Sequence, residues 1–157
     1  MIAQLQLLSK NVQMHLQPIL CLLTGQVVKV EALARLQDTD GKLLLPSAFL
    51  PSLTNHELTT LFCEGLNQTL SWLRKHDDLE DCSTPKIELC INMPPNCLKQ
   101  DWIVGHISEA LAQYQIAPSR LIIEILETHC INQNIQIDAI MALKAIGVRL
   151  GIDDLGS

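Results

Sequence analysis

Carboxylates and one carboxamide lie within or directly after apolar strands at four places in this chain. Glu31, Asn92 and Glu124 each follow or interrupt apolar residues, and Asp153 and Asp154 come directly after the apolar segment VRLGI. Oxygen ligands presented by successive strands suit a hard divalent cation. Two adjacent aspartates repel each other, and a bound cation relieves that repulsion. The pattern therefore predicts a site for Mg²⁺ or Mn²⁺, because zinc would favour His or Cys ligands.

The spacing of these residues places them at similar heights on neighbouring strands. Asn92, Glu124 and Asp153 recur at intervals of about 30 residues, which is the length of one strand-plus-helix unit. Taken singly, each acidic residue has a simpler explanation as a solvent-facing charge at a strand end or as a helix cap. Their joint occurrence at matched positions favours a shared site.

An arginine lies close to the first of these positions. Arg35 follows Glu31 by four residues in the same expected strand, so the two side chains share a face of the sheet. An arginine beside a cation site is suited to a phosphate oxygen. With a net charge of −6, the chain can accept a small anionic ligand only if a metal and arginines offset the charge.

The elements that must position these residues alternate along the chain. Hydrophobic periodicity and turn residues first predict a short helix at 2–10, strands at 14–20 and 26–36 forming a hairpin around Thr24-Gly25, and a loop at 38–41. They then predict a helix with apolar positions over 58–73 that ends near the charged segment 76–81, a strand at 86–92, a helix at 103–114, a strand at 119–126, a helix at 135–146 and a strand at 148–152. This alternation implies an α/β fold with a parallel sheet and right-handed crossovers. The near-continuous apolar strands indicate that both faces of the sheet are covered.

Composition limits the classes of protein to consider. With 157 residues, 48% of them hydrophobic and 18% charged, the chain is expected to form one packed domain. No basic cluster accumulates, so a nucleic-acid duplex is not an expected partner. No apolar run is long enough to span a bilayer, and the N-terminus lacks the regions of a signal peptide, so the sequence predicts a cytoplasmic protein without a membrane segment.

The cysteines and histidines do not form a recognisable metal motif. Six cysteines occur without a CxxC pair or regular spacing, which favours buried, reduced thiols. The five histidines show no pair at metal-ligand spacing. A zinc site is therefore not expected.

Five segments together resemble one known family. EALAR (Glu31 to Arg35) resembles the signature of the EAL domain family, the cyclic di-GMP phosphodiesterases. LQPI precedes it, the hairpin TGQVVKVEAL contains it, and CINMP, IIEILET and GIDDLGS follow in the family's order. The resemblance spans nearly the whole chain. It implies a modified (β/α)₈ TIM-like barrel whose first strand is antiparallel.

The resemblance also implies roles for the acidic residues and a reaction. Glu31, Asn92, Glu124 and Asp153 would bind a metal, and Asp154 would bind a second one. Glu31 and Asp154 would thereby be catalytic. The reaction implied is the hydrolysis of cyclic di-GMP to linear pGpG by a metal-activated water.

Three further residues receive ligand or loop roles from the same resemblance. Arg35 would contact a ligand phosphate, and Gln17 would lie near the bound nucleotide. Glu127 would stabilise the loop after the strand that carries the paired aspartates. The family pattern is not matched everywhere: the chain has Leu36, Pro94, Leu126 and Leu155 where the family usually has Trp, Ser, Thr and Phe.

The length leaves alternatives open. A full (β/α)₈ barrel needs about 250 residues, and the family's later strands supply a lysine, a glutamate and a glutamine that these 157 residues do not include. We therefore expect residues 1–157 to be the N-terminal portion of an EAL domain. The alternatives are a natural truncation that pairs with another chain and a degenerate, non-catalytic module that signals by binding a ligand or a protein.

Incomplete closure has a physical consequence. An open half-barrel would expose unpaired strand edges and one apolar face of the sheet. The sequence therefore also predicts that the isolated chain is partly unfolded, self-associated or aggregated. A homo-oligomer and a sensory partner are both open as partners of the chain.

Overall fold

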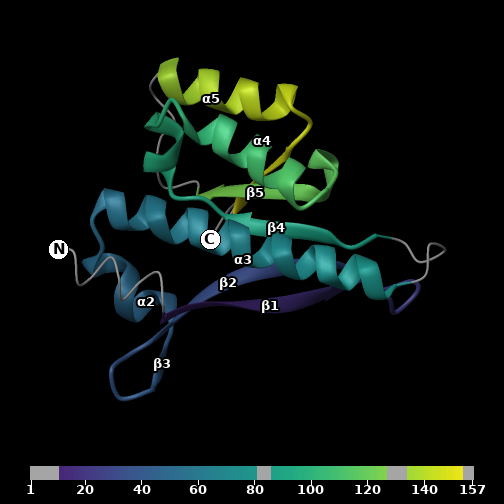
Figure 1. The fold of residues 1–157 in the computed structure, drawn as a ribbon, viewed down its shortest axis with the longest axis horizontal. Helices are drawn as coiled ribbons and strands as arrows, with labels where there is room; N and C mark the ends of the chain where they lie inside the picture. The colour runs from purple at the N-terminus through teal and green to yellow at the C-terminus, as the bar shows by residue number, and fades with distance from the viewer. Residues whose placement is uncertain (1–10, 81–85, 127–133, 154–157) are drawn as a thin grey trace.

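A computed structural model describes residues 11–80, 86–126 and 134–153 of the chain (Figure 1). The expected helix at 2–10 lies outside these residues. The elements in chain order are β1 (Val12–Leu20), β2 (Val27–Gln37), β3 (Leu43–Leu44), α2 (Pro46–Phe49), η1 (Leu50–Ser52), α3 (Asn55–Leu79), β4 (Glu88–Asn92), η2 (Pro95–Lys99), α4 (Ile103–Gln113), η3 (Pro118–Arg120), β5 (Leu121–Leu126), α5 (Asn134–Ala145) and β6 (Arg149–Asp153).

One mixed sheet organises the described residues. Its strand order is β1-β2-β4-β5-β6, with β3 paired to β2. The β1–β2 hairpin is antiparallel, and β2, β4, β5 and β6 run parallel to one another. The expected hairpin and parallel sheet are therefore confirmed. Strand β5 begins two residues later than expected because Pro118 starts a 3₁₀ turn that extends to Arg120.

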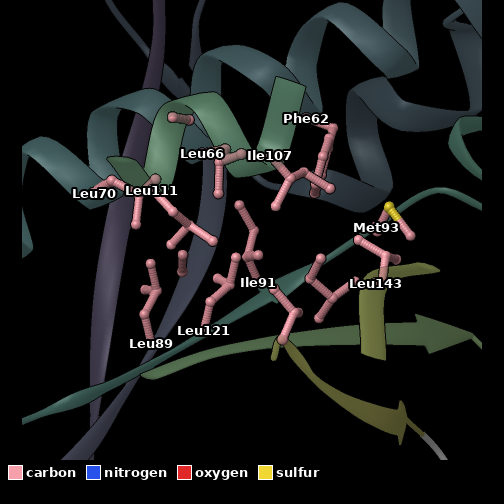
Figure 2. Close-up of a cluster of buried hydrophobic side chains, with 14 of the residues drawn as sticks. Phe62, Leu66, Leu70, Leu89, Ile91, Met93, Ile107, Leu111, Leu121 and Leu143 are labelled. Carbon is pink, nitrogen blue, oxygen red and sulfur yellow. The ribbon is translucent and has the colours of Figure 1, made fainter. Parts of the chain in front are cut away.

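Helices α3, α4 and α5 cover one face of this sheet (Figure 1). The core between them is aliphatic, and it combines helix residues such as Leu66, Leu70 and Ile107 with strand residues such as Leu89 and Ile91 (Figure 2). Gly147, at φ +95°, follows α5 and lets the chain turn into β6. In the described part of the chain, no helix combines the length and the apolar character needed to cross a membrane.

The opposite face of the sheet is more polar than the sequence predicted. Residues that are paired in register on parallel strands point to the same side, so Glu31, Cys90, Asn92 and Glu124 share this face. Near the start of the strands, Arg149 forms an ion pair with Glu88 on the same side. Within each apolar strand the polar residues are spaced two or four positions apart. Because alternate residues of a strand point to the same side, these polar residues all lie on one face of the sheet. The expectation of an exposed apolar sheet face is therefore wrong for the described strands.

Helix α3 is fixed at its start and along its middle. Thr54 and Glu57 form a capping box: the Thr54 Oγ1 accepts from the Glu57 backbone N–H, and the Glu57 carboxylate accepts from the Thr54 backbone N–H at 2.8 Å. Farther along, the Gln68 amide accepts from the Met14 backbone N–H at 3.2 Å and donates to the Val12 carbonyl at 3.0 Å. These contacts hold α3 against β1.

The end of α3 is held by a largely buried ion pair. The Arg120 guanidinium binds both carboxylate oxygens of Asp77 and donates to the Ile87 carbonyl at 2.7 and 2.9 Å. The two side chains are only 14% and 11% exposed. This pair joins α3 to the starts of β4 and β5. Helix α3 ends at Leu79, within the charged segment 76–81 where the sequence predicted its end.

Candidate functional site

Three of the predicted ligand residues come together toward the carboxyl ends of the parallel strands. Glu31 lies on β2, Asn92 ends β4 and Glu124 lies on β5. The Asn92 Nδ2 donates to the Glu31 Oε1 at 3.3 Å, and Asn92 is the register partner of Glu124. The convergence expected from the spacing of Asn92 and Glu124 is therefore confirmed, and Glu31 joins them from the adjacent strand.

The Asn92 side chain carries an oxygen that lacks a protein partner. Its Oδ1 is buried and accepts no hydrogen bond, a situation that costs about 1–3 kcal/mol for a polar group. Because the amide nitrogen is used by Glu31, this oxygen points away from that contact and is available as a ligand. Two carboxylates and one free carboxamide oxygen form a donor set that fits Mg²⁺ or Mn²⁺.

Glu124 has room for its side chain because its neighbour on β6 is glycine. A Cβ atom at position 151 would lie 3.0 Å from the Glu124 Cγ and 3.6 Å from its Oε1. The first distance is tighter than an ordinary contact, so the Glu124 side chain would have to shift by a few tenths of an ångström to admit a Cβ atom at position 151. Sequence reasoning did not single out Gly151, although an isolated glycine inside a strand is a recognised sign of close approach.

Cys90 lies beneath these residues on the same face. Burial raises the pKa of its thiol to about 12, and the neighbouring Glu124 and Glu31 carboxylates act in the same direction. The thiol is therefore protonated near neutral pH. Cys90 and Cys97 are buried free thiols, as expected, whereas Cys21 and Cys63 are partly exposed.

An open cavity of about 720 Å³ adjoins Glu31 and Asn92. Its walls come from the ends of β2 and β4, the turns α2 and η1, the start of α3 and the Pro94–Pro95 segment. Asn96 fixes part of this rim, since its Nδ2 donates to the Asn55 carbonyl at 2.8 Å and to the Thr59 Oγ1 at 2.9 Å. A mostly apolar cavity with a few polar groups at one side is typical of a small-molecule site.

Two other residues predicted for the site, Gln17 and Arg35, lie on β1 and β2. Gln17 is exposed on β1 opposite Glu31 in the register, and Arg35 donates to the Ala34 carbonyl at 2.8 Å. Asp153 ends β6, but its side chain, Asp154 and Glu127 lie outside the described residues. Among the described side chains, no three His, Cys, Asp or Glu residues gather closely enough to hold a metal.

The antiparallel hairpin followed by parallel strands matches the fold of the TIM-barrel domains of EAL proteins in solved structures. Residues 2–157 match the model of the EAL domain family, and the chain belongs to that family.

Curated relatives support the assignment. The chain is 27% identical over 154 residues to the probable cyclic di-GMP phosphodiesterase PdeB of Escherichia coli, covering 95% of this chain and 28% of the relative. It is 30% identical over 145 residues to the cyclic di-GMP phosphodiesterase RocR of Pseudomonas aeruginosa, covering 91% and 36%. The chain thus spans about a third of the length of these relatives.

Solved structures also show that the chain has the fold of this family. The PaMucR phosphodiesterase in complex with c-di-GMP superposes with a TM-score of 0.84 at 25% identity, over 98% of this chain and 64% of that one. Klebsiella pneumoniae BlrP1 in a manganese and c-di-GMP complex has a TM-score of 0.75 at 25% identity, over 94% and 36%.

Proposed function

We propose that this chain provides a Mg²⁺- or Mn²⁺-dependent site for cyclic di-GMP and acts in its hydrolysis to pGpG. The observation that carries the proposal is the contact between Glu31 and Asn92 beside Glu124, with the Asn92 Oδ1 buried and unpartnered. On this view the sheet is the N-terminal portion of an EAL-type (β/α)₈ barrel, and the cavity beside Glu31 receives part of the nucleotide.

The residues divide between metal binding and ligand binding. Glu31, Asn92, Glu124 and Asp153 would hold a cation, and Asp154 would contribute to a second one. A bound divalent cation would polarise the phosphodiester and make a water more acidic. Glu31 and Asp154 would be the catalytic carboxylates.

The other side chains would orient the substrate. Arg35 lies on the same face as Glu31 and already points its guanidinium along the backbone, where a phosphate oxygen can replace the Ala34 carbonyl as its partner. Gln17 would contact the nucleotide from β1. Glu127 would stabilise the loop that follows the strand carrying Asp153 and Asp154.

The proposal predicts a change in metal affinity that calorimetry can measure. In Glu124→Gln the carboxamide keeps an oxygen but loses the negative charge, so Mn²⁺ affinity should fall about tenfold. Asp153→Asn should have a similar effect. Glu109→Gln, the same change at an exposed position on α4, should bind Mn²⁺ as the parent does.

The same samples test the nucleotide. Cyclic di-GMP should bind the parent chain in the presence of Mn²⁺ and bind Arg35→Met more weakly. Unchanged Mn²⁺ affinity in both carboxylate variants would refute the metal assignment. Binding of cyclic di-GMP without any pGpG on chromatography would retain the site and exclude hydrolysis by these residues alone.

A further inference from the structure

Cys90 is a buried residue on the face of the sheet that carries the candidate site, and the proposed function gives it no role. It lies on β4, the strand between the two that carry Glu31 and Glu124. It precedes Asn92 by two residues, so both side chains point to the same face, and it is the register partner of Glu31. Cys90 is only 1% exposed. The thiol therefore lies beneath the predicted ligands, in the part of the sheet that must orient them.

The Cys90 thiol contacts one of these ligands directly. It forms a hydrogen bond with the Glu124 carboxylate, and burial, the charge of Glu124 and this hydrogen bond all raise the pKa of the thiol. The proton therefore remains on the sulfur near neutral pH, so the S–H group is the donor and the carboxylate the acceptor. The strand register allows this contact, because Cys90 pairs with Ile122, two residues before Glu124 on the same face of β5.

Strand β4 thereby supplies one donor to each of the two neighbouring carboxylates. The Asn92 Nδ2 donates to the Glu31 Oε1 at 3.3 Å on one side, and Cys90 donates to Glu124 on the other. From β6, Gly151 leaves the space that the Glu124 side chain occupies. A carboxylate has two oxygens, so one can accept from the thiol while the other binds a cation. Hydrogen-bond partners behind metal ligands commonly fix the orientation of those ligands in this way.

We propose that Cys90 is a positioning residue for Glu124, whose thiol holds one carboxylate oxygen and turns the other toward the cation that Glu31 and Asn92 would bind. The inference rests on the proposed metal site and extends it from the ends of the strands into the sheet. A thiol is a weak donor, so it orients the carboxylate while leaving most of the negative charge for the metal.

Calorimetric titration with Mn²⁺ tests the effect on the site. Cys90→Ala removes the donor and should lower Mn²⁺ affinity about tenfold, the lower end of the range for residues behind metal ligands. Cys90→Ser keeps a donor at the same position and should retain most of the parent's affinity. The matched control is Cys97→Ala, because Cys97 is equally buried but its thiol donates to the Thr59 Oγ1 at 3.7 Å. This variant should bind Mn²⁺ like the parent.

Infrared spectroscopy tests the hydrogen bond in the metal-free chain. Subtracting the spectrum of Cys90→Ala from that of the parent isolates the S–H stretching band of Cys90. Glu124→Gln replaces the charged acceptor by a neutral one, which weakens the hydrogen bond and strengthens the S–H bond. The Cys90 band should therefore move to higher frequency in a Glu124→Gln background. A band that does not respond to this change would overturn the proposal.

The outcomes separate the role of Cys90 from the proposed metal site. A parent that binds no Mn²⁺ would refute the metal site itself. If the parent binds Mn²⁺ and a folded Cys90→Ala binds it equally well, the role of Cys90 alone is refuted. A folded Cys90→Ser that loses as much affinity as Cys90→Ala would also overturn the proposal, because the effect would then not depend on a donor. Thermal unfolding of each variant establishes that it is folded.

Discussion

Replacing Gly151 by valine is expected to lower Mn²⁺ affinity by about 10- to 100-fold, the range for residues that position metal ligands. The reason is steric. A Cβ atom at this position would lie 3.0 Å from the Glu124 Cγ, and the branched valine side chain would add further atoms in the space that Glu124 occupies. The carboxylate would have to leave its place beside Asn92. Calorimetric titration with Mn²⁺ would measure the loss.

The control for this variant is a second glycine. A Cβ at Gly105, on α4, would meet no atom within 4 Å, so Gly105→Val should bind Mn²⁺ like the parent. Thermal unfolding of both variants separates displacement of Glu124 from general loss of structure. If folded Gly151→Val binds Mn²⁺ with the affinity of the parent, Glu124 does not hold the metal in the proposed position.

Replacing Asp77 by alanine is expected to reduce the free energy of unfolding by about 3 kcal/mol, because it leaves the largely buried Arg120 without its carboxylate. The neighbouring Asp78 provides the control. It forms an exposed pair with Arg74 at 2.8 Å, and such surface pairs contribute only about 0–1 kcal/mol. Denaturant unfolding of Asp77→Ala and Asp78→Ala would compare the two. Equal, small losses would contradict a structural role for the Asp77–Arg120 pair.

The pH dependence gives a second signature of this pair. Burial by itself raises the pKa of Asp77, but the hydrogen bond and the charge of Arg120 outweigh it, so the pKa lies below its usual value. A carboxyl whose pKa is lower in the folded state stabilises the fold above its unfolded pKa of about 3.9. That contribution is lost as the pH falls through the folded pKa. The stability difference between the parent and Asp77→Asn should therefore shrink in acid.

The sequence predicted the sheet and the placement of Asn92 beside Glu124 because both depend on local patterns. Apolar runs separated by helical segments define the parallel strands, and the intervals of about 30 residues place Asn92 and Glu124 on adjacent strands at one height. The structure confirms their pairing. The roles of Asp153, Asp154 and Glu127 stay predictions, because their side chains lie outside the described residues.

What the sequence did not predict depends on contacts between distant segments. Asp77 and Arg120 are far apart in the chain, and neither belongs to a motif. The need for glycine at position 151 follows from its register with Glu124, which a single sequence does not specify. The polar face of the sheet was missed for a related reason: the strands were interpreted as continuously apolar, although Glu88 and Arg149 project from the face that carries Glu31.

The contact of Gln68 with β1 has a consequence for how the sheet ends. Its primary amide offers one acceptor and one donor to the Met14 N–H and the Val12 carbonyl, as the peptide group of an adjoining strand would. The Gln68 side chain thus forms, at the outer edge of β1, two hydrogen bonds that a neighbouring strand would otherwise form. Any incoming chain that extended the sheet on this side would have to displace the Gln68 amide first. The first residues of β1 are thereby protected from templating intermolecular β-structure.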